Sequence, residues 1–171
     1  MLGFKPMQRL IPPGPEVVAS PTTLAYLAGF FDGEGSVTVS SRSNRPGDIS
    51  YFLQITISQT TLPVLQLYQR YFGGAIGSVK RPAGYSLTWQ WRPHHRGMTL
   101  FLSSLLPFLI LKKPQAEIAL AFLEAYRLAS SGQPYRLSRA AREIGEEFIT
   151  KFSQLNQNPL GTRGGGRRRR L

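Results

Sequence analysis

The feature that most constrains the fold of this chain is a change of period around Glu34. Ser20-Pro21 can begin a helix, because serine is a good N-cap and proline fits the first helical turn. The segment from Thr22 to Phe31 then predicts a helix, and two glycines bracket Glu34 where that helix ends. From Val37 onward polar and apolar residues alternate, which is typical of a strand. The chain therefore passes from a helix into a strand around a single acidic residue.

Small residues recur every four positions along this helix, at Ala25, Gly29 and Gly33. Positions four apart lie on the same side of a helix. Small side chains let a second backbone approach closely, a packing mode best documented in membranes. The spacing predicts that this side of the helix contacts another helix.

The remaining periodicity predicts an α+β domain with the element order α-β-β-α-β-β-α-α-α. A turn at 45–48 separates the first two strands, and Thr61 can cap a second helix that ends near Gly73-Gly74. Two further strands and three helices are expected at Ala75–Lys80, Tyr85–Arg92, Met98–Leu106, Pro114–Ala129 and Ser138–Leu155. We expect a flexible lead-in over residues 1–19, one domain over 20–157, and a disordered basic tail over 158–171.

The charge balance predicts a polyanionic partner. The 171 residues carry 21 Lys+Arg against 9 Asp+Glu, a net charge of +12. The chain stays basic even without the tail arginines, Arg163 and Arg167 to Arg170. Nucleic acid is the leading partner for such a chain. The alternative is an ordinary basic protein whose excess charge is solvated.

Cysteine usage and hydropathy narrow the cellular locations expected for the protein. The absence of cysteine excludes disulfides and cysteine-zinc sites, and it permits an intracellular location. No apolar run reaches the length of a membrane span, and the first twenty residues lack the apolar core of a signal peptide. We expect an intracellular protein of a bacterial cytoplasm or an organelle (chloroplast or mitochondrion), neither secreted nor bound to a membrane.

The stretch Leu27-Ala28-Gly29-Phe30-Phe31-Asp32-Gly33-Glu34-Gly35 resembles the LAGLIDADG motif of homing endonucleases, in the form that ends in Glu. The expected elements match the αββαββα unit of that family, with a curved antiparallel DNA-binding sheet and additional C-terminal helices. Pro107 to Ala116 is similar to its lysine-bearing segment, so the resemblance covers about Thr22 to Arg127. It implies a DNA-cutting enzyme that promotes the mobility of its host intron. Only one motif copy is present, which implies a homodimer joined through Ala25, Gly29 and Gly33 and a long, nearly palindromic target.

The resemblance also implies site residues and a cofactor. Glu34 and the Gly33 carbonyl would bind Mg²⁺ or Mn²⁺, with Ca²⁺ as a non-catalytic substitute, since hard cations prefer oxygen ligands. Lys112 would lie near the reacting phosphate, although spacing alone does not distinguish it from Lys113. Gln59 would position a water or a phosphate. Asp32 would make hydrogen bonds around the helix end rather than bind metal.

One departure from the family concerns the positions shortly after Gln59. Some relatives carry a basic residue there, whereas this chain has Leu62-Pro63. Part of the usual set of basic residues is therefore missing or supplied from elsewhere in the chain.

The polar faces of the expected strands predict contacts with double-stranded DNA. A two-stranded ribbon fits the major groove, where arginine suits guanine and glutamine or asparagine suits adenine. A sheet face that is exposed only to water would show much the same pattern of polar residues. The residues concerned are Thr38, Ser40, Arg42, Asn44, Ser50, Gln54, Thr56, Lys80, Arg81, Ser86, Thr88, Gln90 and Arg92.

Two other functions fit the same residues. LAGLIDADG proteins include RNA maturases, for which the partner would be the host intron RNA, and metal-dependent cutting of duplex DNA separates the two. The second alternative is a DNA-binding regulator that no longer cuts. The presence of both Glu34 and Lys112 argues against that alternative.

Overall fold

The structure, a computed structural model, describes residues 19–45, 48–79, 86–129 and 139–156 of the chain. The order of elements is the predicted one, and the α+β fold class is confirmed. The strands are β1 (Gly35–Arg45), β2 (Asp48–Gln59), β3 (Ala75–Val79) and β4 (Thr88–Arg92). The helices are α1 (Pro21–Glu34), α2 (Leu62–Phe72), α3 (Met98–Leu105), α4 (Lys113–Ala129) and α5 (Arg139–Asn156), with 3-10 turns at His95–Gly97 and Leu106–Phe108.

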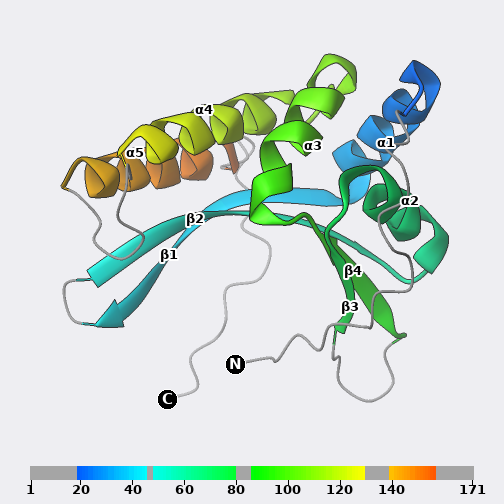
Figure 1. The fold of residues 1–171 in the computed structure, drawn as a ribbon, viewed down its shortest axis with the longest axis horizontal. Coiled ribbons are helices and arrows are strands. Elements are labelled where there is room, and N and C mark those ends of the chain that lie inside the picture. The colour runs from blue at the N-terminus through cyan, green and yellow to red at the C-terminus, as the bar shows by residue number, and fades with distance from the viewer. Residues whose placement is uncertain (1–18, 46–47, 80–85, 130–138, 157–171) are drawn as a thin grey trace, which may run out of the picture.

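The four strands form one antiparallel sheet in the order β1-β2-β4-β3. The sheet is arched, and the helices of the described residues all lie on one side of it, so that no described helix covers its other side, here called the open face (Figure 1). Because antiparallel sheets can face water on one side, the strands alternate between apolar and polar residues. The fold therefore separates a helix-covered face from an exposed one.

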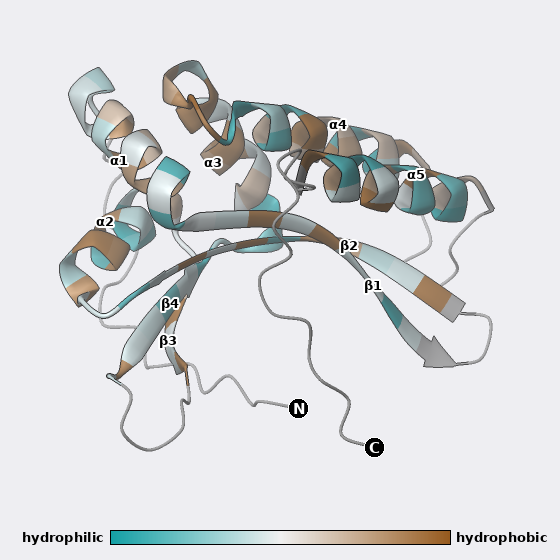
Figure 2. Cartoon of the chain, turned by 180° about the vertical axis from the view of Figure 1, so that it is seen from behind, coloured by the Kyte–Doolittle hydropathy of each residue, from teal (hydrophilic) through white to brown (hydrophobic). Residues whose placement is uncertain are grey.

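The long β1–β2 hairpin follows this alternation closely. Val37, Val39, Leu53, Ile55 and Ile57 are buried on the helix-covered face. The register pairs Val37 with Ile55 and Val39 with Leu53, so apolar residues meet across the two strands. Figure 2 shows the same mixture of hydrophilic and hydrophobic residues along α4 and α5, which cover this hairpin.

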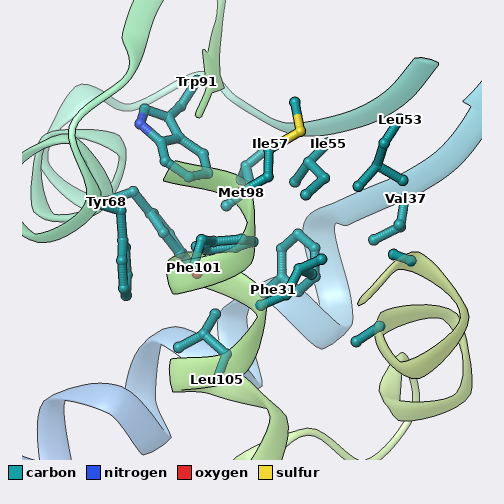
Figure 3. Close-up of a cluster of buried hydrophobic side chains, with 14 of the residues drawn as sticks. Phe31, Val37, Leu53, Ile55, Ile57, Tyr68, Trp91, Met98, Phe101 and Leu105 are labelled. Carbon is teal, nitrogen blue, oxygen red and sulfur yellow. The ribbon is translucent and has the colours of Figure 1, made fainter. Parts of the chain in front are cut away.

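An aromatic cluster fills the core beneath α1, α2 and α3 (Figure 3). The Phe101 ring packs against Phe31, Phe72 and Trp91, each with a centroid separation of 5.1 Å. Phe31 and Phe101 have no exposed surface, and neither does Trp91. Burial of large rings dominates core energetics, so this cluster fixes α1 against the sheet.

Helix α5 packs directly on the hairpin at Gly145. A Cβ atom at this position would lie 2.2 Å from the Tyr51 ring, so only glycine permits the contact. The Tyr51 hydroxyl donates to the Glu146 carboxylate at 3.3 Å. The C-terminal helices therefore support the strands that carry the open face.

Some boundaries differ from the predictions. Helix α1 extends beyond the predicted segment from Thr22 to Phe31, since it begins at Pro21, and it ends at Glu34, where the sequence placed the helix end. The last strand is shorter than expected, because pairing with β3 begins only at Thr88, and Leu87 is exposed. The expected lead-in and basic tail lie outside the described residues. Within the described segments, no helix is long and apolar enough to cross a membrane.

Candidate active site and sheet surface

Helix α1 is capped at its N-terminus and anchored along one face. The Ser20 side chain accepts a hydrogen bond from the Thr23 amide at 3.2 Å, as expected of an N-cap. Leu27, Ala28 and Phe31 are completely buried. The Tyr68 hydroxyl donates to the Leu27 carbonyl oxygen at 2.5 Å, and burial raises the pKa of Tyr68 well above its usual value. The buried face therefore locks the helix into the protomer.

The opposite face of α1 has no packing partner among the described residues of the protomer. Ala25, Gly29 and Gly33 are exposed there, as is Tyr26, with 56% of its surface accessible. A Cβ atom built at Gly29 or Gly33 would meet nothing within 4 Å. The protomer itself therefore gives no reason for the absence of side chains at these two positions.

The helix ends at Glu34, and the strand begins at the next residue. A Cβ atom at Gly35 would lie 2.2 Å from the Phe31 ring, so the chain can turn into β1 here only with glycine. The Gly35 amide still donates to the Phe31 carbonyl, which closes the last helical turn. Glu34 is exposed at this junction. Its carboxylate lies at the edge of the fold, on a backbone fixed by the close contact next to it.

Asp32, two residues earlier, has a different environment. It is 8% exposed, and its two carboxylate oxygens accept hydrogen bonds from the amides of Ile110 and Lys112, each at 2.8 Å. Both acceptor oxygens are thus used to hold the backbone before α4. The hydrogen-bonding role predicted for Asp32 is the one that this geometry supports.

Lys112 is brought to the same helix end. Its ammonium group donates to the Asp32 carbonyl oxygen. Burial lowers the pKa of Lys112, while the charges of Asp32 and Glu34 act in the opposite direction. Lys113 is exposed and begins α4. The structure therefore separates the two lysines that spacing could not: Lys112 is the one at the end of α1.

Gln59 is the last residue of β2, two residues beyond Ile57, which pairs with Gly35. Its side-chain oxygen accepts from the Thr60 amide at 2.7 Å and from the Thr60 hydroxyl at 3.1 Å. Within the described part of the chain, no hydrogen bond joins it to Glu34 or Lys112. The backbone brings Gln59 to the same end of the sheet, but its side chain is turned to its own neighbour.

The open face of the sheet carries most of the predicted polar residues. Those described there are Thr38, Ser40, Arg42, Ser50, Gln54, Thr56, Gln90 and Arg92. Gln90 donates to the Ser58 hydroxyl at 3.0 Å and accepts from the Arg92 guanidinium at 2.8 Å. Ser58 was absent from the predicted set, although the alternation that selected Gln54 and Thr56 also selects it.

Thr88 corrects the prediction, because it is only 7% exposed and its hydroxyl donates to the Ser86 carbonyl at 3.4 Å. Ser86 is exposed just before β4. Lys80 and Arg81 lie outside the described residues, as does the side chain of Asn44. Five positions of the predicted DNA surface therefore carry no observed open-face side chain on the sheet.

The sequence profile described as LAGLIDADG endonuclease matches residues 27–109, just under half of the chain, and the chain is similar to this family over that segment. No curated protein matches the chain. Among solved structures it is similar to the homing endonuclease I-CvuI in complex with a DNA target, with 22% identity, 82% of this chain and 86% of that chain covered, and a TM-score of 0.62. The archaeal intron-encoded homing endonuclease I-Vdi141I complexed with DNA has 20% identity, 80% and 98% coverage, and a TM-score of 0.52.

A third similar structure, I-SmaMI bound to an uncleaved DNA target in the presence of calcium ions, has 22% identity and a TM-score of 0.54. The match covers 77% of this chain but only 44% of that one. At such identities the three likenesses show a shared fold. The I-SmaMI chain is thus long enough for two units of this size.

Proposed function

We propose that this protein is a homing endonuclease that makes a metal-dependent double-strand break in a long, pseudo-palindromic DNA target. The observation that carries the proposal is the end of α1. There the exposed side chain of Glu34 shares a helix end with the ammonium group of Lys112, which donates to the Asp32 carbonyl oxygen and which the Glu34 charge influences. An exposed carboxylate and a held cation at one helix end suit phosphodiester cleavage, which needs an activated water and a stabilised leaving oxygen.

A homodimer would complete this site. The exposed face of α1 offers Ala25, Gly29 and Gly33 to a second helix, with open space above both glycines. A two-fold axis through this face would bring two copies of Glu34 together. The partial coverage of the longer I-SmaMI chain supports the same assembly, because this chain holds one such unit where that chain has room for two.

The donor set fits a divalent metal shared between protomers. Each protomer offers one exposed carboxylate at the helix end, and no three His, Cys, Asp or Glu side chains gather as a metal site among the described residues. Glu34 and the Gly33 carbonyl would therefore hold Mg²⁺ or Mn²⁺ only together with their symmetry mates and the DNA, with Ca²⁺ as a non-catalytic substitute. When bound, such an ion activates water and stabilises the leaving oxygen.

Lys112 and Gln59 would act on the substrate near Glu34. Lys112 is partly buried, so its charge is less screened than that of a surface lysine and can attract the scissile phosphate. Gln59 can donate its amide hydrogens to a water or a phosphate, because its oxygen is already engaged with Thr60.

The open face of the sheet would read the target in the flanking major grooves. Asn44, Lys80, Arg81 and Ser86 remain part of this proposal on sequence grounds, and Thr88 does not, since it is buried. In the arched sheet, the helices cover the far side and leave this face accessible (Figure 1).

The test is selection of cut sites from a random duplex library in Mg²⁺, followed by mapping of the ends. With the sheets in the major grooves, the dyad and both Glu34 copies face the central minor groove. Phosphates that lie nearest across this groove are offset toward the 3′ ends, so we expect a near-palindromic site with short 3′ overhangs. Recovery of no preferred site would overturn the proposal, and blunt or 5′-extended ends would overturn this geometry.

A further inference from the structure

One aromatic residue interrupts the polar face of the β1–β2 hairpin. Phe52 lies between Ser50 and Gln54 along β2 and pairs across to Ser40 on β1. Its strand neighbours Tyr51 and Leu53 are buried on the helix side, so Phe52 belongs to the open face. It is 41% exposed.

The described part of the protomer makes little use of this ring. Phe52 belongs neither to the buried core nor to the partly buried side chains that pack against it. The helices lie on the other side of the sheet, as Figure 1 shows. A polar residue would satisfy the alternation of the strand equally well, so the fold does not require an aromatic side chain here.

The side chains around Phe52 indicate the chemistry of a partner that would bind over its ring. Its neighbours on the same face are polar, with Thr38 and Arg42 beside Ser40 on β1. A single ring among polar side chains is too small an apolar patch to dock a protein, since specific interfaces bury about 1,200–2,000 Å². It matches a surface that is polar overall and carries isolated methyl groups. The major groove of DNA is such a surface, because only thymine places a methyl group there.

We propose that Phe52 reads thymine through its 5-methyl group, and that it thereby sets one position of the target in each half-site. This inference rests on the proposed function, in which the open face lies in the major groove. Base edges rather than base faces are presented in that groove, which favours contact with the methyl group over stacking of the ring.

The register gives an approximate place for this thymine. Phe52 is five residues from Ile57, which pairs with Gly35 next to Glu34. Five residues of strand span about 17 Å, at about 3.3 Å per residue. A base pair rises about 3.4 Å, so the contact falls roughly five base pairs outward from the cleaved bonds.

The test begins with the target selected by cleavage, bound in Ca²⁺ by the full-length protein. Each thymine is replaced in turn by deoxyuridine, which lacks only the methyl group. A lost methyl contact should weaken binding about fourfold at one half-site and about fifteenfold when both symmetric positions are replaced. The Phe52→Ala variant should bind the thymine and deoxyuridine targets equally at these positions.

The matched control is Leu100→Ala, which removes another exposed apolar side chain, on α3 and away from the sheet. It should keep the full deoxyuridine effect. The inference is overturned if the selected target has no thymine in this window, if deoxyuridine there has no effect, or if Phe52→Ala retains the effect. Those outcomes leave the endonuclease intact, whereas recovery of no preferred site removes the proposed function and this inference with it.

Discussion

Helix α1 presents opposite kinds of residues on its two faces. Its inner face buries Leu27, Ala28 and Phe31 completely, and Asp32 uses both carboxylate oxygens on backbone amides. Its outer face exposes Gly29 and Gly33 to empty space, and Glu34 stands exposed at its end. One face thus contributes to the stability of the protomer, while the other contributes nothing to it that the structure describes. Residues on the outer face that do not stabilise the protomer are therefore the ones to test for function.

The largest effect should follow from Glu34→Gln, which keeps size and polarity but removes the charge. In the proposed site it would lose the metal, so cleavage should fall by about 10³-fold or more, as judged from losses of single charge-stabilising groups elsewhere. Binding in Ca²⁺ and the unfolding temperature should hardly change, because the residue is exposed. Cleavage in Mg²⁺ and binding in Ca²⁺ are measured on one preparation.

Glu117→Gln is the matched control, since Glu117 is an exposed acid on α4. It should cut at the parental rate. If Glu34→Gln cuts nearly as fast as the parent, the metal assignment is wrong and Asp32 becomes the candidate. A Glu34→Gln protein that no longer binds would place Glu34 in the fold or the dimer instead.

Substitutions at two neighbouring residues distinguish the roles of the two faces of α1. Gly29→Leu should leave the protomer folded, since no described atom lies within 4 Å of a Cβ there, but it should overpack the proposed dimer contact. Ala28→Leu should instead destabilise the protomer by about 1–3 kcal/mol, because Ala28 is fully buried. Sedimentation reports the assembly and thermal unfolding reports the protomer. An intact dimer for Gly29→Leu, or a monomeric parent, would show that the contact lies elsewhere.

A smaller, mixed effect should come from Asp32→Asn. The amide offers one acceptor oxygen where the carboxylate offers two, so one of the amides of Ile110 and Lys112 loses its partner. An unpaired buried donor costs about 1–3 kcal/mol, which should lower the unfolding temperature by several degrees. The cleavage rate should fall while DNA affinity persists, since Lys112 would lose its fixed position. Parental stability and rate together would contradict this role.

The smallest effect on cleavage should come from deletion of residues 161–171. These carry five arginines and lie outside the described residues, so the prediction rests on charge alone. Each lost phosphate contact should flatten the slope of log affinity against log salt by about 0.9. The preferred target sequence should not change. A salt slope equal to that of the full chain would remove the tail from the DNA-binding surface.

The sequence predicted the elements and the outer face of α1 because both depend on local spacing. Alternation located the strands, and the small residues that recur every four positions lie exposed on one face of α1, where the predicted contact with another helix stays a prediction. Phe52 interrupts the polar face of β2, but the sequence alone does not say whether its ring is covered. That required the register and the position of the helices.

The contacts at the helix end could not be predicted, because they join residues far apart in the chain. Asp32 bonds to amides nearly eighty positions away, and only the fold brings Lys112 rather than Lys113 to that end. Thr88 was placed on the open face by the same alternation that placed Gln90 there. Thr88 is buried nonetheless, and its hydroxyl donates to the Ser86 carbonyl at the start of β4, a local contact that alternation does not predict.

No linker separates α1 from β1, since Glu34 ends the helix and Gly35 begins the strand. Helix α1 and the β1–β2 hairpin therefore move together as one rigid unit. In the proposed dimer, the angle at which the two α1 helices cross would fix both the distance and the phase between the two half-sites. One extra base pair at the centre of the target turns one half-site by roughly 35° and shifts it by about 3.4 Å. Because no flexible residues at this junction can absorb the altered rotation and distance, the protein would discriminate against a changed half-site spacing as strictly as against a changed base.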